Sequence, residues 1–150
     1  MGKVQILAVL TMDGCLSSEL YDKAHQDLCL DRCGLDEIRK KAFYRVTPDY
    51  SISMLHEWRK DCTNIRYLAE ATPDTADYIN GLLRMHAVDE IILYTVPFIS
   101  GSGRHFFKSA LPEQHWTLSS LKSYPNGVCR IIYILDKKAR SVSYTHLTLP

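Results

Sequence analysis

The residues best suited to chemistry stand in one short segment, Glu70-Ala71-Thr72-Pro73-Asp74-Thr75-Ala76. It follows an apolar run, Ile65–Glu70, that has the length of a buried strand. Thr72 can cap the free N–H groups of a helix, Pro73 suits the first helical position, and Asp74 complements the positive end of the helix dipole. Small residues after a strand let a ligand approach the backbone, and a helix N-terminus can bind phosphate. A plain helix cap explains the same residues, and the charge of Asp74 favours that interpretation over a phosphate site.

A second candidate is the loop Gly101-Ser102-Gly103-Arg104, which follows the apolar run Ile91–Val96 and Pro97. Arg104 is the only fixed positive charge in that loop and could reach a ligand phosphate. A single Gly-x-Gly is more often a structural turn than a binding site. The Asp13-Gly14 pair near the N-terminus indicates another tight turn, with or without a ligand.

The elements that must position these residues form a strand–helix–strand unit. Apolar residues recur at helical spacing between the two strands, so one face of the helix can pack on a sheet. These residues are Ala76, Ile79, Leu82 and Leu83. Such units normally close as parallel pairs with a right-handed crossover, and their ligands bind beyond the carboxyl ends of the strands. Here those ends are Glu70-Ala71-Thr72 and Pro97–Gly103.

The rest of the chain predicts further helices and strands around this unit. Lys3–Leu10 is a near-continuous apolar run, as expected of a central strand buried on both faces. The expected helices are Ser17 or Ser18 to about Leu30, Leu35–Phe43 and Ser51–Lys60, and His105–Ala110 is a short helix or turn. Trp116–Leu121 and Val128–Leu135 would form an antiparallel edge hairpin through Pro125-Asn126-Gly127. We therefore expect an α/β fold, a three-layer α/β/α sandwich around a mixed, mainly parallel sheet.

The order of these segments resembles the reductase domain of the bacterial riboflavin-biosynthesis deaminase-reductase, a member of the dihydrofolate-reductase-like fold. The resemblance rests on an apolar strand, Glu70, two small residues, a helix, Val88-Asp89-Glu90, a second apolar strand, Pro97 and Gly-x-Gly-Arg. Ala8–Gly14 looks like the family's first strand with its Ser-Leu-Asp-Gly turn. The resemblance covers residues 3–14 and 65–107, extends weakly to 127–135, and is absent from 15–64.

The resemblance implies a site for NADPH and for a small-molecule substrate. The backbone of Leu10 would lie near the nicotinamide. The other implied cofactor contacts come from one segment and one loop: Thr72, Pro73, Asp74, Thr75 and Ala76, and the glycines Gly101 and Gly103. Glu70 would contact the substrate, and no proton donor is implied. Many members of the family have Gly-Gly where this chain has Ala71-Thr72. Thr72 puts a β-branched side chain where a phosphate would need the backbone.

The composition is that of an ordinary globular domain. The chain has 150 residues, of which 46% are hydrophobic and 23% charged, and a net charge of +1 gives no pull toward nucleic acid or anionic lipid. We expect no membrane span, since no apolar run approaches about 18 residues, and no secretory signal. The five widely spaced cysteines suit reduced thiols in the cytoplasm. Cys29 and Cys33 lack a partner pair or histidine cluster, so we expect no metal.

We expect one domain over residues 1–138. The segment Ser141–Pro150, SVSYTHLTLP, breaks with the preceding pattern and resembles a translated transposase adapter from sequencing-library preparation. A short natural tail is the alternative.

The resemblance implies an NADPH-dependent reductase that transfers hydride to a pterin-like or ribosylaminopyrimidine-like substrate. The alternative is a catalytically inactive, shortened member that serves as a binding or regulatory module, which the missing Gly-Gly and the shortened middle favour. Fold-level analogy does not choose between the two. The expected partners exclude nucleic acid and membrane and leave a homodimer open.

Overall fold

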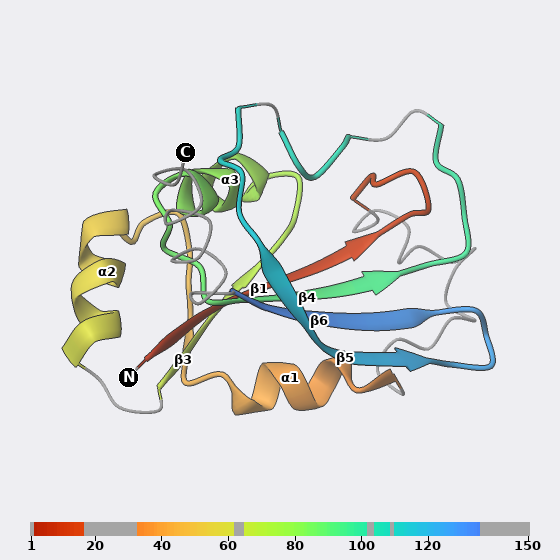
Figure 1. Ribbon diagram of the computed structural model, residues 1–150, viewed down its shortest axis with the longest axis horizontal. Helices are drawn as coiled ribbons and strands as arrows, with labels where there is room; N and C mark the ends of the chain where they lie inside the picture. Colours follow the sequence, from red (N-terminus) through yellow and green to blue (C-terminus); the bar gives the residue numbers. More distant parts are fainter. Residues whose placement is uncertain (1, 17–32, 62–64, 102–103, 109, 136–150) are drawn as a thin grey trace, which may run out of the picture.

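The computed structural model describes residues 2–16, 33–61, 65–101, 104–108 and 110–135. Within these ranges the elements alternate between helices and strands in the first two thirds and end in a hairpin (Figure 1). In chain order they are β1 Lys3–Leu10, α1 Leu35–Lys41, β2 Tyr44–Arg45, α2 Ile52–Asp61, β3 Arg66–Glu70, α3 Ala76–Arg84, β4 Glu90–Thr95, β5 Trp116–Ser123 and β6 Cys129–Leu135.

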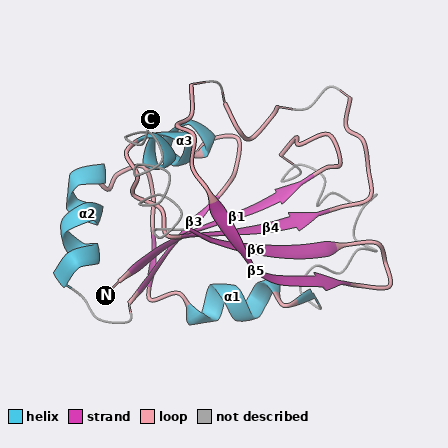
Figure 2. Cartoon of the chain, in the orientation of Figure 1, coloured by secondary structure: helices cyan, strands magenta, loops and turns pink. Residues whose placement is uncertain are grey.

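The strands form one six-stranded sheet in the order β2-β3-β1-β4-β6-β5 (Figure 2). Strand β1 lies between β3 and β4 and is parallel to both, with Leu7 opposite Glu70 and Leu10 opposite Thr95. Strand β6 is antiparallel to β4 and to β5. The predicted mixed, mainly parallel sheet and its three adjacent parallel strands are confirmed.

Helices cover both faces of the central strands, which is why β1 is buried from Val4 to Leu10. The even-numbered residues of β1 share one core with apolar residues of α2 and α3, such as Leu55 and Ile79. Leu7 and Val9 face the other way and pack with Leu35 of α1. We refer to these as the α2/α3 face and the α1 face of the sheet. The predicted three-layer sandwich is confirmed.

Two predicted helices are confirmed with shifted ends, as α1 and α2. The predicted helix at Thr72-Pro73 starts too early, because α3 begins only at Ala76 and the preceding residues form a separate turn. Strand β2 was not predicted, since its two residues are too short for any periodicity to show. The helix predicted from Ser17 or Ser18 to Leu30 lies outside the described residues.

The C-terminal hairpin follows the prediction, with Gly127 at a φ of 90° in the turn and the Tyr124 N–H 2.9 Å from the Val128 carbonyl. The pairing of β5 with β6 contains one irregularity that the sequence did not indicate. Leu118 pairs with Tyr133 and Ser120 pairs with Ile132, so Ser119 is an extra, bulged residue.

Candidate functional site

The candidate site lies at the end of the sheet where the carboxyl ends of the neighbouring strands β1 and β3 lie side by side. The chain that leaves β3 leads to α3 on one face, whereas α1, the first described helix after β1, lies on the other. Adjacent parallel strands whose connections diverge in this way leave a crevice in which ligands of α/β sheets bind. Ala71 continues the strand past Glu70, and its N–H donates to the Leu7 carbonyl over 2.8 Å. Leu10 ends β1 with a buried side chain and a carbonyl that accepts the Val96 N–H.

Two threonines organise the turn that joins β3 to α3. The Thr75 hydroxyl lies 2.9 Å from the Glu70 carbonyl, to which it donates, and 2.8 Å from the Thr72 N–H, from which it accepts. The Thr72 hydroxyl accepts the Thr75 N–H over 3.2 Å. Thr72 therefore caps this turn, and Thr75 stands at the N-cap position of α3. Two of the backbone N–H groups that the sequence offered to a phosphate are already satisfied by side chains.

The first turn of α3 still supplies donors. The opening N–H groups of an α-helix have no acceptor within the helix, and here they belong to Ala76 and Asp77. The carboxylates of Asp74 and Asp77 stand exposed beside them and would oppose a bound phosphate. Pro73, in the turn itself, has no N–H to offer.

Glu70 lies at the end of β3 with its carboxylate on the α1 face. There it forms an ion pair with Arg39 of α1, and the two side chains are 33% and 29% exposed. The sequence did not single out Arg39. It stands one turn after Leu35, the buried residue of α1, and that spacing could have identified it as the helix residue nearest the strand end.

Hydrogen bonds join the loop after β1 to the loop after β4. The Asp13 carboxylate accepts hydrogen bonds from the Ser100 N–H at 3.1 Å, the Gly101 N–H at 3.0 Å and the Thr11 hydroxyl. The Thr11 hydroxyl, followed by the two backbone N–H groups, holds the pKa of Asp13 well below its usual range. The Leu16 N–H donates to the Arg104 carbonyl over 2.9 Å and extends the contact. The Asp13-Gly14 turn therefore has a structural role in joining the two loops.

Of the two loop glycines, Gly101 has a φ of 74° and open space around its Cα, whereas Gly103 lies outside the described residues. Arg104 is exposed. The structure therefore brings Gly101 to the Asp13 carboxylate, while Thr72–Ala76 follow β3 at the same edge of the sheet.

The α1 face carries another polar group near the end of β4. The Tyr94 and Tyr124 hydroxyls each donate to the Cys33 carbonyl over 2.8 Å. Burial raises the pKa of Tyr94 to about 12, against a smaller opposing effect of Arg130. Tyr94 therefore stays protonated at neutral pH, and its proton is held by the backbone before α1.

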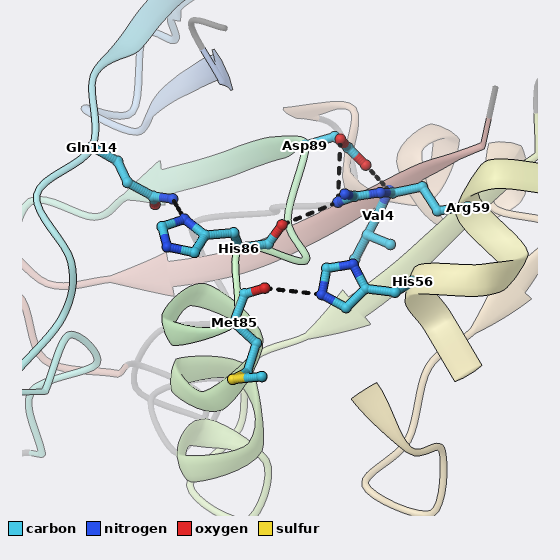
Figure 3. Close-up of polar contacts among 7 residues, drawn as sticks. All are labelled: Val4, His56, Arg59, Met85, His86, Asp89 and Gln114. Carbon is cyan, nitrogen blue, oxygen red and sulfur yellow. Dashed lines mark hydrogen bonds and ion pairs between the residues drawn. The ribbon is translucent and has the colours of Figure 1, made fainter. Parts of the chain in front are cut away.

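A polar cluster lies at the other end of the sheet, where β1 and β4 begin (Figure 3). Asp89 of the Val-Asp-Glu segment belongs to this cluster. Arg59 of α2 approaches the Asp89 carboxylate at 3.5 Å and donates to the His86 carbonyl, and Asp89 also accepts the Val4 N–H. His86 lies 2.6 Å from the Gln114 side-chain amide through its Nδ1. These contacts tie α2, the end of α3 and the start of β1 together, far from the crevice.

Within the described ranges, no group of three or more His, Cys, Asp or Glu residues could hold a metal ion. No described helix is long and apolar enough to cross a membrane.

Comparison with protein-family models and with curated protein sequences gives no match. Solved structures do match. A Shewanella sp. PV-4 protein assigned to riboflavin biosynthesis superposes with a TM-score of 0.56 at 9% identity, over 90% of this chain and 99% of that one. RibD of Acinetobacter baumannii, form 2, gives a TM-score of 0.56 at 13% identity over 91% of this chain. Form 1 of the same protein gives 0.50 at 12% identity.

The chain spans 58% of the length of RibD form 2. At these identities the match concerns the fold. It agrees with the sheet order and layers described above, and it confirms the resemblance seen in the sequence at the level of the fold. The chain has the dihydrofolate-reductase-like fold of these riboflavin-biosynthesis proteins.

Proposed function

We propose that the protein is an NADPH-dependent reductase of the riboflavin-biosynthesis class. Its substrate would be a pterin-like or ribosylaminopyrimidine-like molecule. Two structural neighbours that carry the argument bear the names riboflavin biosynthesis protein and RibD, and the fold is shared over about nine tenths of this chain.

The proposal rests on one observation: the end of β3 presents different chemical groups on the two faces of the sheet. The Glu70 carboxylate meets Arg39 on the α1 face, whereas the turn that follows leads to α3 on the other face. A hydride transfer needs two ligands in contact, with the accepting atom of one over the hydride-bearing carbon of the other, one ligand on each side of such a crevice. The α3 side offers backbone N–H groups suited to phosphate, and the α1 side offers a carboxylate and a guanidinium suited to a polar heterocycle.

The residues on the α3 side fit the phosphates of a dinucleotide if these lie somewhat nearer the helix than a Gly-Gly pair would allow. The N–H groups of Ala76 and Asp77 are available, and Arg104 could add a positive charge from the neighbouring loop. The Thr72 and Thr75 hydroxyls take the place that a Gly-Gly pair leaves open, so the phosphates would lie closer to the helix than to the strand end. NADPH, when bound, supplies the hydride. The protein's part is to hold the two ligands in contact and to exclude water.

The test is consumption of NADPH by the purified chain, followed by absorbance, with a ribosylaminopyrimidine phosphate or a dihydropterin as acceptor. Oxidation that depends on the acceptor supports the proposal, and the product is identified by mass spectrometry. Absence of oxidation with both acceptors, together with demonstrated NADPH binding, would contradict the reductase assignment. That result would favour the binding or regulatory module, for which the occupied N–H groups of the turn are the supporting observation.

A further inference from the structure

Asn80 is a fully buried polar residue in α3. Its side-chain nitrogen donates to the Ala76 carbonyl, one turn earlier in the helix, and to the Phe106 carbonyl, each over 2.8 Å. Its side-chain oxygen accepts the Lys108 N–H over 3.0 Å. The orientation of the amide is fixed, because two carbonyls face its nitrogen and an N–H faces its oxygen. Asn80 therefore ties α3 to residues 104–108, which follow β4.

The contacts outside the helix explain why an asparagine stands at this position. A buried amide must have its hydrogen bonds satisfied, and the three partners of Asn80 meet that need. The helix itself gains little from the residue, since Asn forms helices less readily than Ala or Leu. What the asparagine adds is the attachment of residues 104–108.

Residues 104–108 are also held from their other side, by the loop after β1. The Leu16 N–H donates to the Arg104 carbonyl over 2.9 Å, and the Phe106 N–H donates to the Gly14 carbonyl over 3.1 Å. In Figure 1 the segment passes the end of α3 that follows β3, before the chain turns into β5. It therefore lies between the loop after β1 and α3, with the side chain of Arg104 exposed at its start.

We propose that Asn80 is a positioning residue for cofactor binding, an inference that rests on the proposed function. It holds residues 104–108 against the first turn of α3, so that the Arg104 guanidinium stays within reach of phosphates bound there. Asn80 links Phe106 to Ala76, the first residue of α3, and Arg104 precedes Phe106 by two residues, or about 7 Å of extended chain. Without Asn80 the segment would keep its contacts with the loop after β1 and lose those with α3.

A positive charge fixed at this place has a clear use. The exposed carboxylates of Asp74 and Asp77 stand beside the first turn of α3 and oppose a phosphate. A guanidinium held nearby offsets that repulsion and can donate two parallel hydrogen bonds to phosphate oxygens. Because Asn80 orders the segment before the ligand arrives, less conformational entropy is lost on binding.

Calorimetric titration of NADPH measures this role. Asn80→Ala and Arg104→Gln should each weaken NADPH binding by about tenfold, because each removes the same phosphate contact. The double variant should bind about as weakly as either single variant, since Asn80 acts through Arg104. Independent contributions would instead multiply to a loss of about a hundredfold.

Two matched controls separate positioning from a general loosening of the fold. Tyr78→Phe removes another hydrogen bond from α3, the one that the Tyr78 hydroxyl donates to the Tyr50 carbonyl over 2.7 Å. It should lower the stability in urea and leave the NADPH affinity unchanged. Arg84→Gln removes an exposed positive charge from the last turn of α3 and should also leave the affinity unchanged.

Hydrogen exchange of the wild type tests the same link without a substitution in the core. The coupling between two sites is reciprocal, so NADPH should slow the exchange of the Lys108 N–H, which donates to Asn80, by about tenfold. The effect should be absent in Arg104→Gln. The Tyr124 N–H, in the hairpin turn, should exchange at the same rate with and without NADPH and is the internal control.

The outcomes distinguish this inference from the proposed function. If NADPH binds to wild type and Asn80→Ala binds it equally well, the positioning role is wrong and the reductase proposal stands. The same conclusion follows if the losses multiply in the double variant, if Tyr78→Phe loses as much affinity as Asn80→Ala, or if NADPH leaves the exchange of Lys108 unchanged. Absence of NADPH binding to wild type overturns both proposals.

Discussion

The Arg39 guanidinium and the Glu70 carboxylate form an ion pair that joins α1 to the carboxyl end of β3. About a third of each side chain remains exposed, so the pair borders the crevice and water screens it. Such a pair contributes little to the free energy of folding. Its value lies in holding the carboxylate in one orientation at the strand end, where the proposed substrate would lie.

Replacing Glu70 by Gln should therefore lower turnover more than it lowers NADPH affinity. The substitution removes the charge and keeps the shape, and we expect the free energy of unfolding to change by less than about 1 kcal/mol. Glu57→Gln, an exposed glutamate on α2, is the control. Steady-state kinetics and calorimetric titration of NADPH measure the two effects separately. Equal losses of turnover and cofactor affinity would contradict a role for Glu70 on the substrate side.

Replacing Asp13 by Asn should loosen the contact between the loops after β1 and β4. The folded state lowers the pKa of Asp13, so its contribution to stability is present above the unfolded pKa of about 3.9 and is lost as the pH falls below it. The variant should unfold at a lower temperature than wild type at pH 7, and the difference should shrink below about pH 4. Asp49→Asn, at an exposed aspartate, is the control. A difference that is the same at pH 7 and pH 3 would rule out the charge as the cause.

Thr75→Ala should destabilise the turn between β3 and α3 by about 1 to 2 kcal/mol, because it removes the acceptor of the Thr72 N–H. Thr75→Ser retains the hydroxyl and should remain close to wild type. Urea denaturation measures both free energies of unfolding. Equal losses in the two variants would show that the methyl group, and not the hydroxyl, matters.

His86 follows α3 with a φ of 56°, in a conformation that favours glycine. The His86 and Ala87 N–H groups return to the carbonyls of Leu83 and Leu82, as in a Schellman motif. His86→Gly and His86→Ala both remove the contact with Gln114, so their difference isolates the backbone. The glycine variant should be more stable than the alanine variant by about 1 kcal/mol in thermal or urea unfolding. Equal stability would contradict the left-handed conformation.

The sequence predicted the sheet well because its central strands are buried on both faces and appear as unbroken apolar runs. Lys3–Leu10 was predicted with the observed bounds, and α2 and α3 were found from apolar residues that recur at helical spacing. Strand β2 and the bulge at Ser119 gave no signal. Both depend on pairing with distant residues, which no local pattern records.

The candidate site was predicted less completely. Thr72 and Thr75 were named as candidates for phosphate binding. In the structure each hydroxyl instead accepts the other residue's N–H. This exchange depends on the geometry of the turn, and a helix-cap pattern in the sequence does not distinguish it from a simple cap. Glu70 was named without Arg39, because the partner comes from a helix 31 residues away. Asp13 was recognised as a turn residue only, since its acceptor role depends on the loop at Ser100 and Gly101.

Direct calorimetric titration of NADPH into wild type, Thr72→Gly, Thr72→Ser and Asp74→Asn tests the central claim most directly. We predict binding to wild type, with tighter binding in Thr72→Gly, which removes the side chain that crowds the backbone, and in Asp74→Asn, which removes a charge near the phosphates. Thr72→Ser should match wild type. Thr72→Gly should also lose a few tenths of a kcal/mol, roughly, of stability without ligand, so affinity must be measured directly and not by thermal shift. Absence of binding at millimolar NADPH in wild type and in both tightening variants would contradict the reductase proposal.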